Sequence, residues 1–305
     1  MLKWLLLAVV LIVGLGAAVG HAARWQLLGL LDVADSWWPG KSGERRAVAL
    51  AYGSGTERKV DIFVPTGTRA GDAKPVIIWF HGGGWDSGGR EFYGFAGRAF
   101  SGEGFVTVVA GYRLGEAGKF PGFIEDAVAA VHWTRDNIAA FGGDPQRIVL
   151  AGHSAGAHIA ALTVLDTRWL REDAFAGGPI KGVIGLATPA DFLPLEQGGS
   201  ADRAMGHAEP LLFTQPIAFA RGDAPPFWLA TGEDDVTVRP KNSINLGNAL
   251  RDAGGQAEII LYPGIDHVEI MTALALPYRD RAPSLVEAAA FAKRVTRVER
   301  APGGE

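Results

Sequence analysis

Residues 147–165 read RIVLAGHSAGAHIAALTVL, and this stretch decides the fold. Its apolar start is typical of a buried β-strand, and the run from Ala155 onward is typical of a buried helix. Between them, Gly152-His153-Ser154-Ala155-Gly156 has the G-x-S-x-G pattern of a sharp strand-to-helix turn. The glycines allow such a turn to close, and the turn exposes the serine beside the amides of a helix N-terminus. The sequence therefore predicts that Ser154 is a nucleophile.

Strand-like and helix-like segments alternate on both sides of this turn. Strands are expected at 47–51, 60–64, 76–80, 105–110, 148–151, 183–186, 227–231 and 258–262. Helices are expected at about 95–102, 123–140, 155–165, 242–253 and 284–298, with a glycine C-cap at Gly254 and a capping box at 284–287. The first two strands suit a hairpin, and the later alternation predicts an α/β fold with a mostly parallel eight-stranded sheet and helices on both faces. The Gly- and Pro-rich segment 189–226 has no clear period, and we interpret it as a lid or pocket wall.

A second glycine motif follows the expected strand at 76–80. His81-Gly82-Gly83-Gly84-Trp85 allows backbone amides to approach a substrate closely. A phosphate-binding loop is the alternative, but this loop lacks Gly-Lys-Ser/Thr, and the sequence has no G-x-G-x-x-G with a downstream acidic residue. Because acyl transfer needs two or three N–H donors for its oxyanion, this loop predicts an oxyanion hole.

A serine nucleophile needs a histidine base and a carboxylate that orients it. In this topology they follow the serine in the order Asp or Glu, then His. Two histidines lie beyond the helix that follows Ser154. His267 comes directly after the last expected strand, where the base belongs, whereas His207 lies in the segment 189–226 and is interpreted as a surface or pocket-wall residue. The base is therefore expected to be His267.

The acidic residue is harder to choose. Glu233, Asp234 and Asp235 are adjacent in the loop after the expected strand at 227–231, and charge alone does not separate them. Asp191, after the preceding strand, is the main alternative.

The order of motifs resembles the α/β-hydrolase superfamily, and within it the hormone-sensitive-lipase-like and feruloyl-esterase-like (BD-FAE) carboxylesterases. The motifs are HGGGW at 81–85, GYRL at 111–114, FGGDP at 141–145, GHSAG at 152–156 and the loops that hold Asp235 and His267. The resemblance implies Ser154 as nucleophile, His267 as base, Asp235 as its orienting acid, since it stands at the family's G-x-x-D-x-x-V position, and the amides of Gly83, Gly84 and Ala155 as the oxyanion hole. It implies no metal and no organic cofactor.

The expected activity is serine carboxylesterase hydrolysis of short-chain or medium-chain acyl esters, or of aryl esters, through an acyl-enzyme. The motif GHSAG replaces the GDSAG common in the lipase-like branch, and HGGGW with GHSAGAH also resembles kynurenine formamidases. A formamidase-like amide hydrolase is therefore one alternative. A catalytically silent binding protein of the same fold is another, although that interpretation usually requires a lost triad residue.

The composition excludes several other classes of protein. The chain has 305 residues, 48% of them hydrophobic, and no cysteine, which excludes intrinsic disorder, a disulfide scaffold and a cysteine nucleophile. A net charge of −4 with interspersed signs argues against a nucleic-acid partner. The expected partner is a small-molecule ester, and the oligomeric state stays open.

The N-terminus carries a separate signal. Residues 4–20 contain no charge, and the uncharged run extends to residue 23 after Lys3. This pattern predicts a signal peptide or membrane anchor at 1–23, with the rest of the chain exported to the periplasmic or extracellular side. Residues 24–45 are interpreted as a connector, in which Trp37 and Trp38 suit either a membrane interface or packing on the folded body. The catalytic domain is expected at 46–298 and a tail at 299–305, so a chain starting near Asp35 is expected to fold and to be active.

Overall fold

We describe a computed structural model of the chain, which defines residues 25–170 and 178–298. Its centre is an eight-stranded sheet in the order β1-β2-β4-β3-β5-β6-β7-β8. The strands are β1 (Glu44–Ala51), β2 (Lys59–Val64), β3 (Lys74–Phe80), β4 (Val106–Ala110), β5 (Gly143–His153), β6 (Ile180–Leu186), β7 (Phe227–Gly232) and β8 (Ala257–Tyr262). β2 is antiparallel to both β1 and β4, and the other pairs are parallel. The eight expected strands and the mostly parallel sheet are confirmed.

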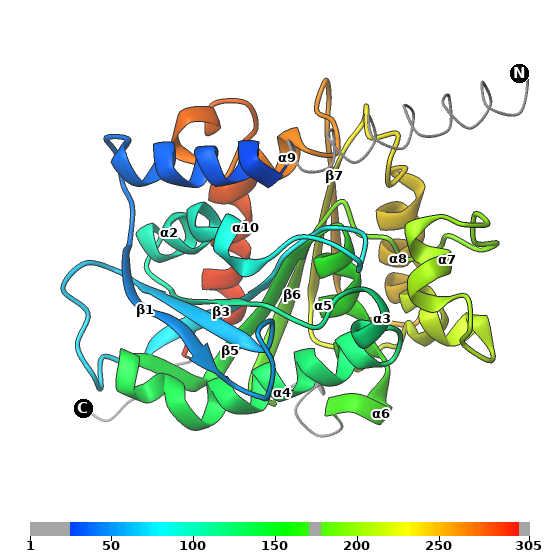
Figure 1. The fold of residues 1–305 in the computed structure, drawn as a ribbon, viewed down its shortest axis with the longest axis horizontal. Coiled ribbons are helices and arrows are strands. Elements are labelled where there is room, and N and C mark those ends of the chain that lie inside the picture. The colour runs from blue at the N-terminus through cyan, green and yellow to red at the C-terminus, as the bar shows by residue number, and fades with distance from the viewer. Residues whose placement is uncertain (1–24, 171–177, 299–305) are drawn as a thin grey trace, which may run out of the picture.

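Helices cover both faces of the sheet (Figure 1). The longer ones are α2 (Gly94–Gly102), α4 (Gly122–Asn137), α5 (Ala155–Leu165), α8 (Lys241–Asp252) and α10 (Ser284–Val295). The short ones are α3 (Gly115–Gly118), α6 (Thr167–Leu170), α7 (Ser200–Met205) and α9 (Glu269–Thr272), with 3-10 turns η1 (Arg90–Phe92), η2 (Ile138–Phe141), η4 (Leu211–Thr214), η5 (Pro216–Phe219) and η6 (Leu276–Tyr278). The expected helices are thus present, and the one expected at 123–140 continues as η2 after α4.

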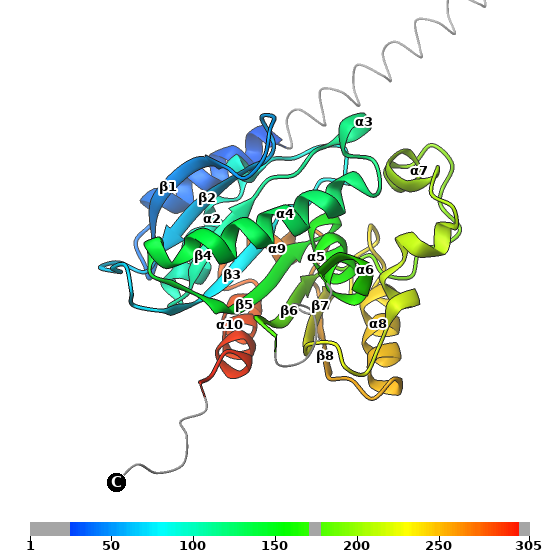
Figure 2. The same ribbon diagram turned by 90° about the horizontal axis from the view of Figure 1, so that it is seen from below.

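Successive residues of a strand point to opposite faces of the sheet, so a hydrophobic core lies on each face. In β3, Val76, Ile78 and Phe80 face a cluster shared with α4, α5 and α8. Ile77 and Trp79 face the opposite cluster, which holds the apolar residues of α2, α9 and α10. Figure 2 shows α4 lying across one face of the sheet. Because both faces are covered, the central strands are almost continuously apolar, as in residues 75–80 of β3.

The ends of α8 and α10 test the expected glycine C-cap and the expected capping box. The C-cap is confirmed: Gly254 follows α8 with a φ of +88°, and its N–H donates to the Arg251 carbonyl. The capping box is wrong, because Pro283 is the N-cap of α10 and the Ser284 hydroxyl instead donates to the Ile270 carbonyl. The Glu287 carboxylate accepts a hydrogen bond from the Tyr262 hydroxyl.

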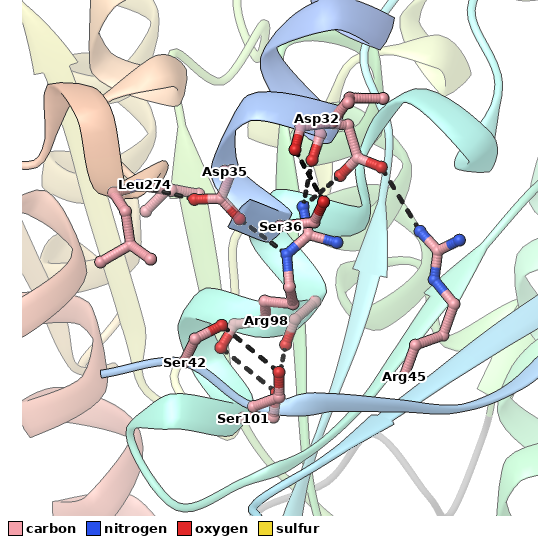
Figure 3. Close-up of polar contacts among 12 residues, drawn as sticks. Asp32, Asp35, Ser36, Ser42, Arg45, Arg98, Ser101 and Leu274 are labelled. Carbon is pink, nitrogen blue, oxygen red and sulfur yellow. Dashed lines mark hydrogen bonds and ion pairs between the residues drawn. The ribbon is translucent and has the colours of Figure 1, made fainter. Parts of the chain in front are cut away.

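The connector interpretation of residues 24–45 is also wrong for most of its length. Residues 25–37 form a helix, which we call helix 25–37, and its Leu28 is buried in the cluster with α2, α9 and α10. Asp32 and Asp35 of this helix form ion pairs with Arg98 of α2 (Figure 3). The folded body therefore includes helix 25–37, and a chain starting near Asp35 would lose most of a packed element.

The predicted signal or anchor at 1–23 and the tail at 299–305 lie outside the described residues. Within the part of the chain that the structure defines, no helix is both long and apolar enough to cross a bilayer.

Candidate active site

Ser154 lies at the turn between β5 and α5, as the sequence predicts. Its φ of 54° and ψ of −124° are strained for an L-residue, and its N–H is held by the Leu186 carbonyl at 2.9 Å. A Cβ on Gly156 would lie 2.1 Å from the backbone oxygen of Phe80. The close packing of α5 on β3 therefore requires glycine there, and the strained turn presents the serine hydroxyl to the cavity.

Ser154, His267 and Asp235 form one hydrogen-bonded chain. The Ser154 hydroxyl lies 3.0 Å from His267 Nε2, and His267 Nδ1 lies 2.8 Å from a carboxylate oxygen of Asp235. The other carboxylate oxygen accepts the N–H groups of Thr237 and Val238 at 2.9 and 2.8 Å. Because a carboxylate can only accept, His267 carries its proton on Nδ1 and presents the Nε2 lone pair to the serine.

The structure shows which of the candidate acidic residues and histidines lie in the site. Asp235 is buried and contacts His267, whereas Asp191 accepts a hydrogen bond from the Asn245 side chain at 2.6 Å. Glu233 and Asp234 are exposed, as is His207. Asp235 is therefore the carboxylate in position to orient the imidazole.

The glycine-rich loop after β3 lies beside the serine. Gly83 and Gly84 line the same cavity as Ser154 and have φ values of +134° and +62°. A Cβ on Gly83 would lie 2.0 Å from the Ser87 carbonyl oxygen, so the loop turns too tightly there for any side chain. Ala155 is the first residue of α5, where a backbone N–H has no acceptor within its own helix. The structure thus brings the three expected amide donors to the region of Ser154.

His153, which precedes the serine, has a role that the sequence motifs do not predict. Its Nε2 lies 2.8 Å from the backbone carbonyl of His267, and the two rings are 4.7 Å apart. Since a carbonyl accepts, His153 donates, and it fixes the backbone of the loop that carries His267. The histidine at the second position of GHSAG, where GDSAG has aspartate, is the sequence feature that could have indicated this contact.

Two further buried histidines pack behind the cavity wall, His158 against Trp85 and His81 against Tyr93. His158 donates Nε2–H to the Thr214 carbonyl and accepts the Trp85 indole N–H at Nδ1. Burial lowers the pKa of His158 to about 4, which keeps the ring neutral and preserves the contact with Trp85. Burial also lowers the pKa of His81 to about 4, and its ring stacks on Tyr112. These histidines are structural rather than proton-transferring groups.

The cavity above Ser154 and His267 has a volume of about 1440 Å3. Its walls are mainly apolar and come from helix 25–37, from the expected lid at 189–226 and from residues 268–278. The lid segment thus forms a pocket wall, and helix 25–37 forms a second wall that the sequence does not predict. Among the residues that the structure describes, no cluster of His, Asp and Glu side chains suits a metal ion.

A family model and several named esterases match this chain. The family model described as BD-FAE matches residues 60–250. Isoprenylcysteine alpha-carbonyl methylesterase ICME of Arabidopsis thaliana is 27% identical over 263 residues, which cover 79% of this chain and 60% of that protein. Esterase LipQ of Mycobacterium tuberculosis is 30% identical over 270 residues, which cover 83% of this chain and 63% of that protein. The chain thus spans less than two thirds of the length of these relatives.

Solved structures share the fold. EstE1, a thermophilic carboxylesterase cloned from a metagenomic library, has a TM-score of 0.76 at 21% identity, covering 91% of this chain and 97% of that one. Esterase 2 of Thermogutta terrifontis has a TM-score of 0.67 at 26% identity, covering 84% and 96%. The matched region of the family model contains the serine turn, the glycine-rich loop and Asp235, and the sheet is that of the α/β-hydrolases. The chain therefore belongs to the BD-FAE family of α/β-hydrolases.

Proposed function

We propose that this protein hydrolyses carboxylic esters through an acyl-enzyme on Ser154. The observation that carries the proposal is the hydrogen-bonded chain from Ser154 through His267 to Asp235, open to an apolar cavity. Relatives named as esterases and a methylesterase support the same reaction class.

Each group has a defined role in this mechanism. His267 Nε2 takes the Ser154 proton as the hydroxyl oxygen attacks the ester carbonyl, and Asp235 stabilises the imidazolium that forms. The amides of Gly83, Gly84 and Ala155 would bind the oxyanion, and each such donor is typically worth about 3 kcal/mol. His267 then protonates the leaving alcohol, and a water activated by the same imidazole hydrolyses the acyl-enzyme.

The cavity supports a bulky apolar substrate. Its volume of about 1440 Å3 exceeds what an acetyl or butyryl group fills, and its walls carry many more apolar than charged side chains. We therefore expect higher kcat/KM for esters with a large apolar acyl or alcohol group than for acetate esters.

We also propose that the enzyme acts outside the cytoplasm. The uncharged run at 4–20 after Lys3 supports export by a signal peptide or an anchor.

A substrate panel tests the proposed reaction. The panel contains p-nitrophenyl esters from acetate to palmitate, feruloyl and acetyl-sugar esters, and N-formylkynurenine, and it is run on the wild type and on Ser154→Ala, with circular dichroism as the folding control. Ester turnover that Ser154→Ala abolishes is expected. Preferential turnover of the formamide, or no turnover by folded protein, would contradict the proposal.

A further inference from the structure

Helix 25–37 and the residue after it present a surface of large apolar side chains. The exposed fractions are 65% for Leu27 and Leu30, 58% for Val33, 86% for Trp37 and 51% for Trp38. We call these five residues the apolar face. Exposed apolar residues on soluble proteins are normally scattered singly, so five within twelve positions indicate a surface with a partner.

The charged residues of this helix point the other way. Asp32 and Asp35 are the only charged residues between positions 25 and 38, and both are buried. They lie 2.6 and 2.7 Å from the Arg98 guanidinium, toward which Figure 3 shows both carboxylates directed. A helix on a water-exposed surface has the opposite arrangement, with charges outward and leucines inward. The ion pairs thus fix the orientation in which the apolar face is exposed.

The apolar face borders the mouth of the cavity. Leu27, Leu30 and Trp38 line the cavity that contains Ser154, and each is at least half exposed, which places them at its rim. Tyr278, from the wall formed by residues 268–278, also lines the cavity and is 48% exposed. A partner seated on the apolar face would therefore meet the entrance to the proposed active site.

We propose that the apolar face docks on the surface of a lipid bilayer, with the cavity mouth turned toward the lipid. The chain itself favours this occupant, because the uncharged run at 4–20 ends only five residues before helix 25–37 and would hold the helix at the membrane. Adjacent tryptophans are typical of the membrane interface, and an uncharged face needs no anionic lipid. In this arrangement an amphiphilic ester enters the cavity directly from the bilayer. This access role rests on the proposed function.

Site-specific fluorescence tests the docking without relying on catalysis. The chain has no cysteine, so Val33→Cys and Trp37→Cys each provide a single site for an environment-sensitive label. Neither residue lines the cavity. Val298→Cys is the matched control, since Val298 is 62% exposed and follows the end of α10 that points away from helix 25–37 (Figures 1 and 2). The labelled full chains are reconstituted in phosphatidylcholine vesicles and exposed to nitroxide lipids or to aqueous iodide.

The two quenchers distinguish the possible occupants. Docking predicts that nitroxide lipids remove most of the emission from labels at 33 and 37, that iodide does not, and that the label at 298 behaves in the opposite way. Labels at 33 and 37 quenched by iodide alone would overturn the proposal, because the face would then be in water. Labels quenched by neither would also overturn it, because another part of the chain or a second copy would cover the face. A full chain that does not float with the vesicles would contradict it as well.

A kinetic comparison tests the consequence for substrate access. Val33→Asp combined with Trp37→Asp should lower turnover of an ester dissolved in the vesicles about a hundredfold, the effect of losing two buried apolar side chains. Turnover of soluble p-nitrophenyl butyrate should not change. Equal loss on both substrates would contradict the access role, whereas lipid quenching without any ester turnover would overturn only the proposed function.

Discussion

Removing the Arg98 guanidinium should destabilise the protein far more than removing a surface ion pair. Arg98 bonds to Asp32 and Asp35, and the side chains of these three residues are 9%, 12% and 1% exposed. Arg98→Met keeps most of the packing volume but leaves two buried carboxylates short of a partner. Asp35 retains the Leu276 N–H at 2.7 Å, and Asp32 retains Arg45 at 3.4 Å. Breaking a buried ion pair in this way costs about 3–5 kcal/mol of unfolding free energy.

Urea denaturation followed by circular dichroism measures this loss. Arg294→Met is the matched control, because the ion pair between Arg294 and Glu258 is about half exposed and should contribute about 0–1 kcal/mol. The triple variant Arg98→Met, Asp32→Asn, Asp35→Asn should recover part of the loss, since it removes the unpaired charges. If Arg98→Met costs no more than Arg294→Met, helix 25–37 is not held to the body by these contacts and our account of the cavity wall is incorrect.

Three other predictions follow from the site and its surroundings. Asp235→Asn should lower kcat about 10⁴-fold, as loss of the orienting carboxylate does in serine triads, while Asp191→Asn should leave kcat within a few-fold of the wild type; steady-state ester kinetics would refute the assignment if the order were reversed. Gly156→Ala should prevent the serine turn from closing, because its Cβ would lie 2.1 Å from a backbone oxygen; a soluble variant with wild-type kcat would contradict this steric argument. Acid should destabilise the fold, because burial lowers the pKa of His81 and His158 from 6.5 to about 4, so the unfolded chain takes up protons that the folded chain does not. Each histidine's contribution, about 3 kcal/mol, should be complete above pH 6.5 and lost as the pH falls toward 4; urea midpoints that stay constant across this range would contradict it.

Local patterns were sufficient to predict the sheet and the nucleophile. The strands are short apolar runs bounded by turn residues, and their burial on both faces leaves a strong signal. The turn at Ser154 is recognisable because its steric demands fall on immediate neighbours such as Gly152 and Gly156. His267 was predicted by its place after the last strand, whereas Asp235 needed the family's spacing, since charge alone did not separate it from its neighbours.

The errors concern contacts between distant segments. Helix 25–37 was interpreted as a connector, but it packs on the folded body with its two carboxylates buried and its leucines at 27 and 30 exposed. The reason is Arg98, more than 60 residues away, which attracts Asp32 and Asp35 inward. The capping box failed for a similar reason, because Glu287 is engaged by Tyr262 from β8. Neither partner can be identified from the local sequence.

Covalent labelling of Ser154 tests the central claim most directly. The full-length protein is treated with a fluorophosphonate, digested, and analysed by mass spectrometry, with Ser154→Ala and His267→Ala treated in parallel. The account predicts one adduct per chain, on the peptide that contains Ser154, with no adduct in Ser154→Ala and strongly slowed labelling in His267→Ala, because His267 removes the serine proton. An adduct on another residue, or labelling of Ser154 that is as fast in His267→Ala as in the wild type, would contradict the proposed mechanism.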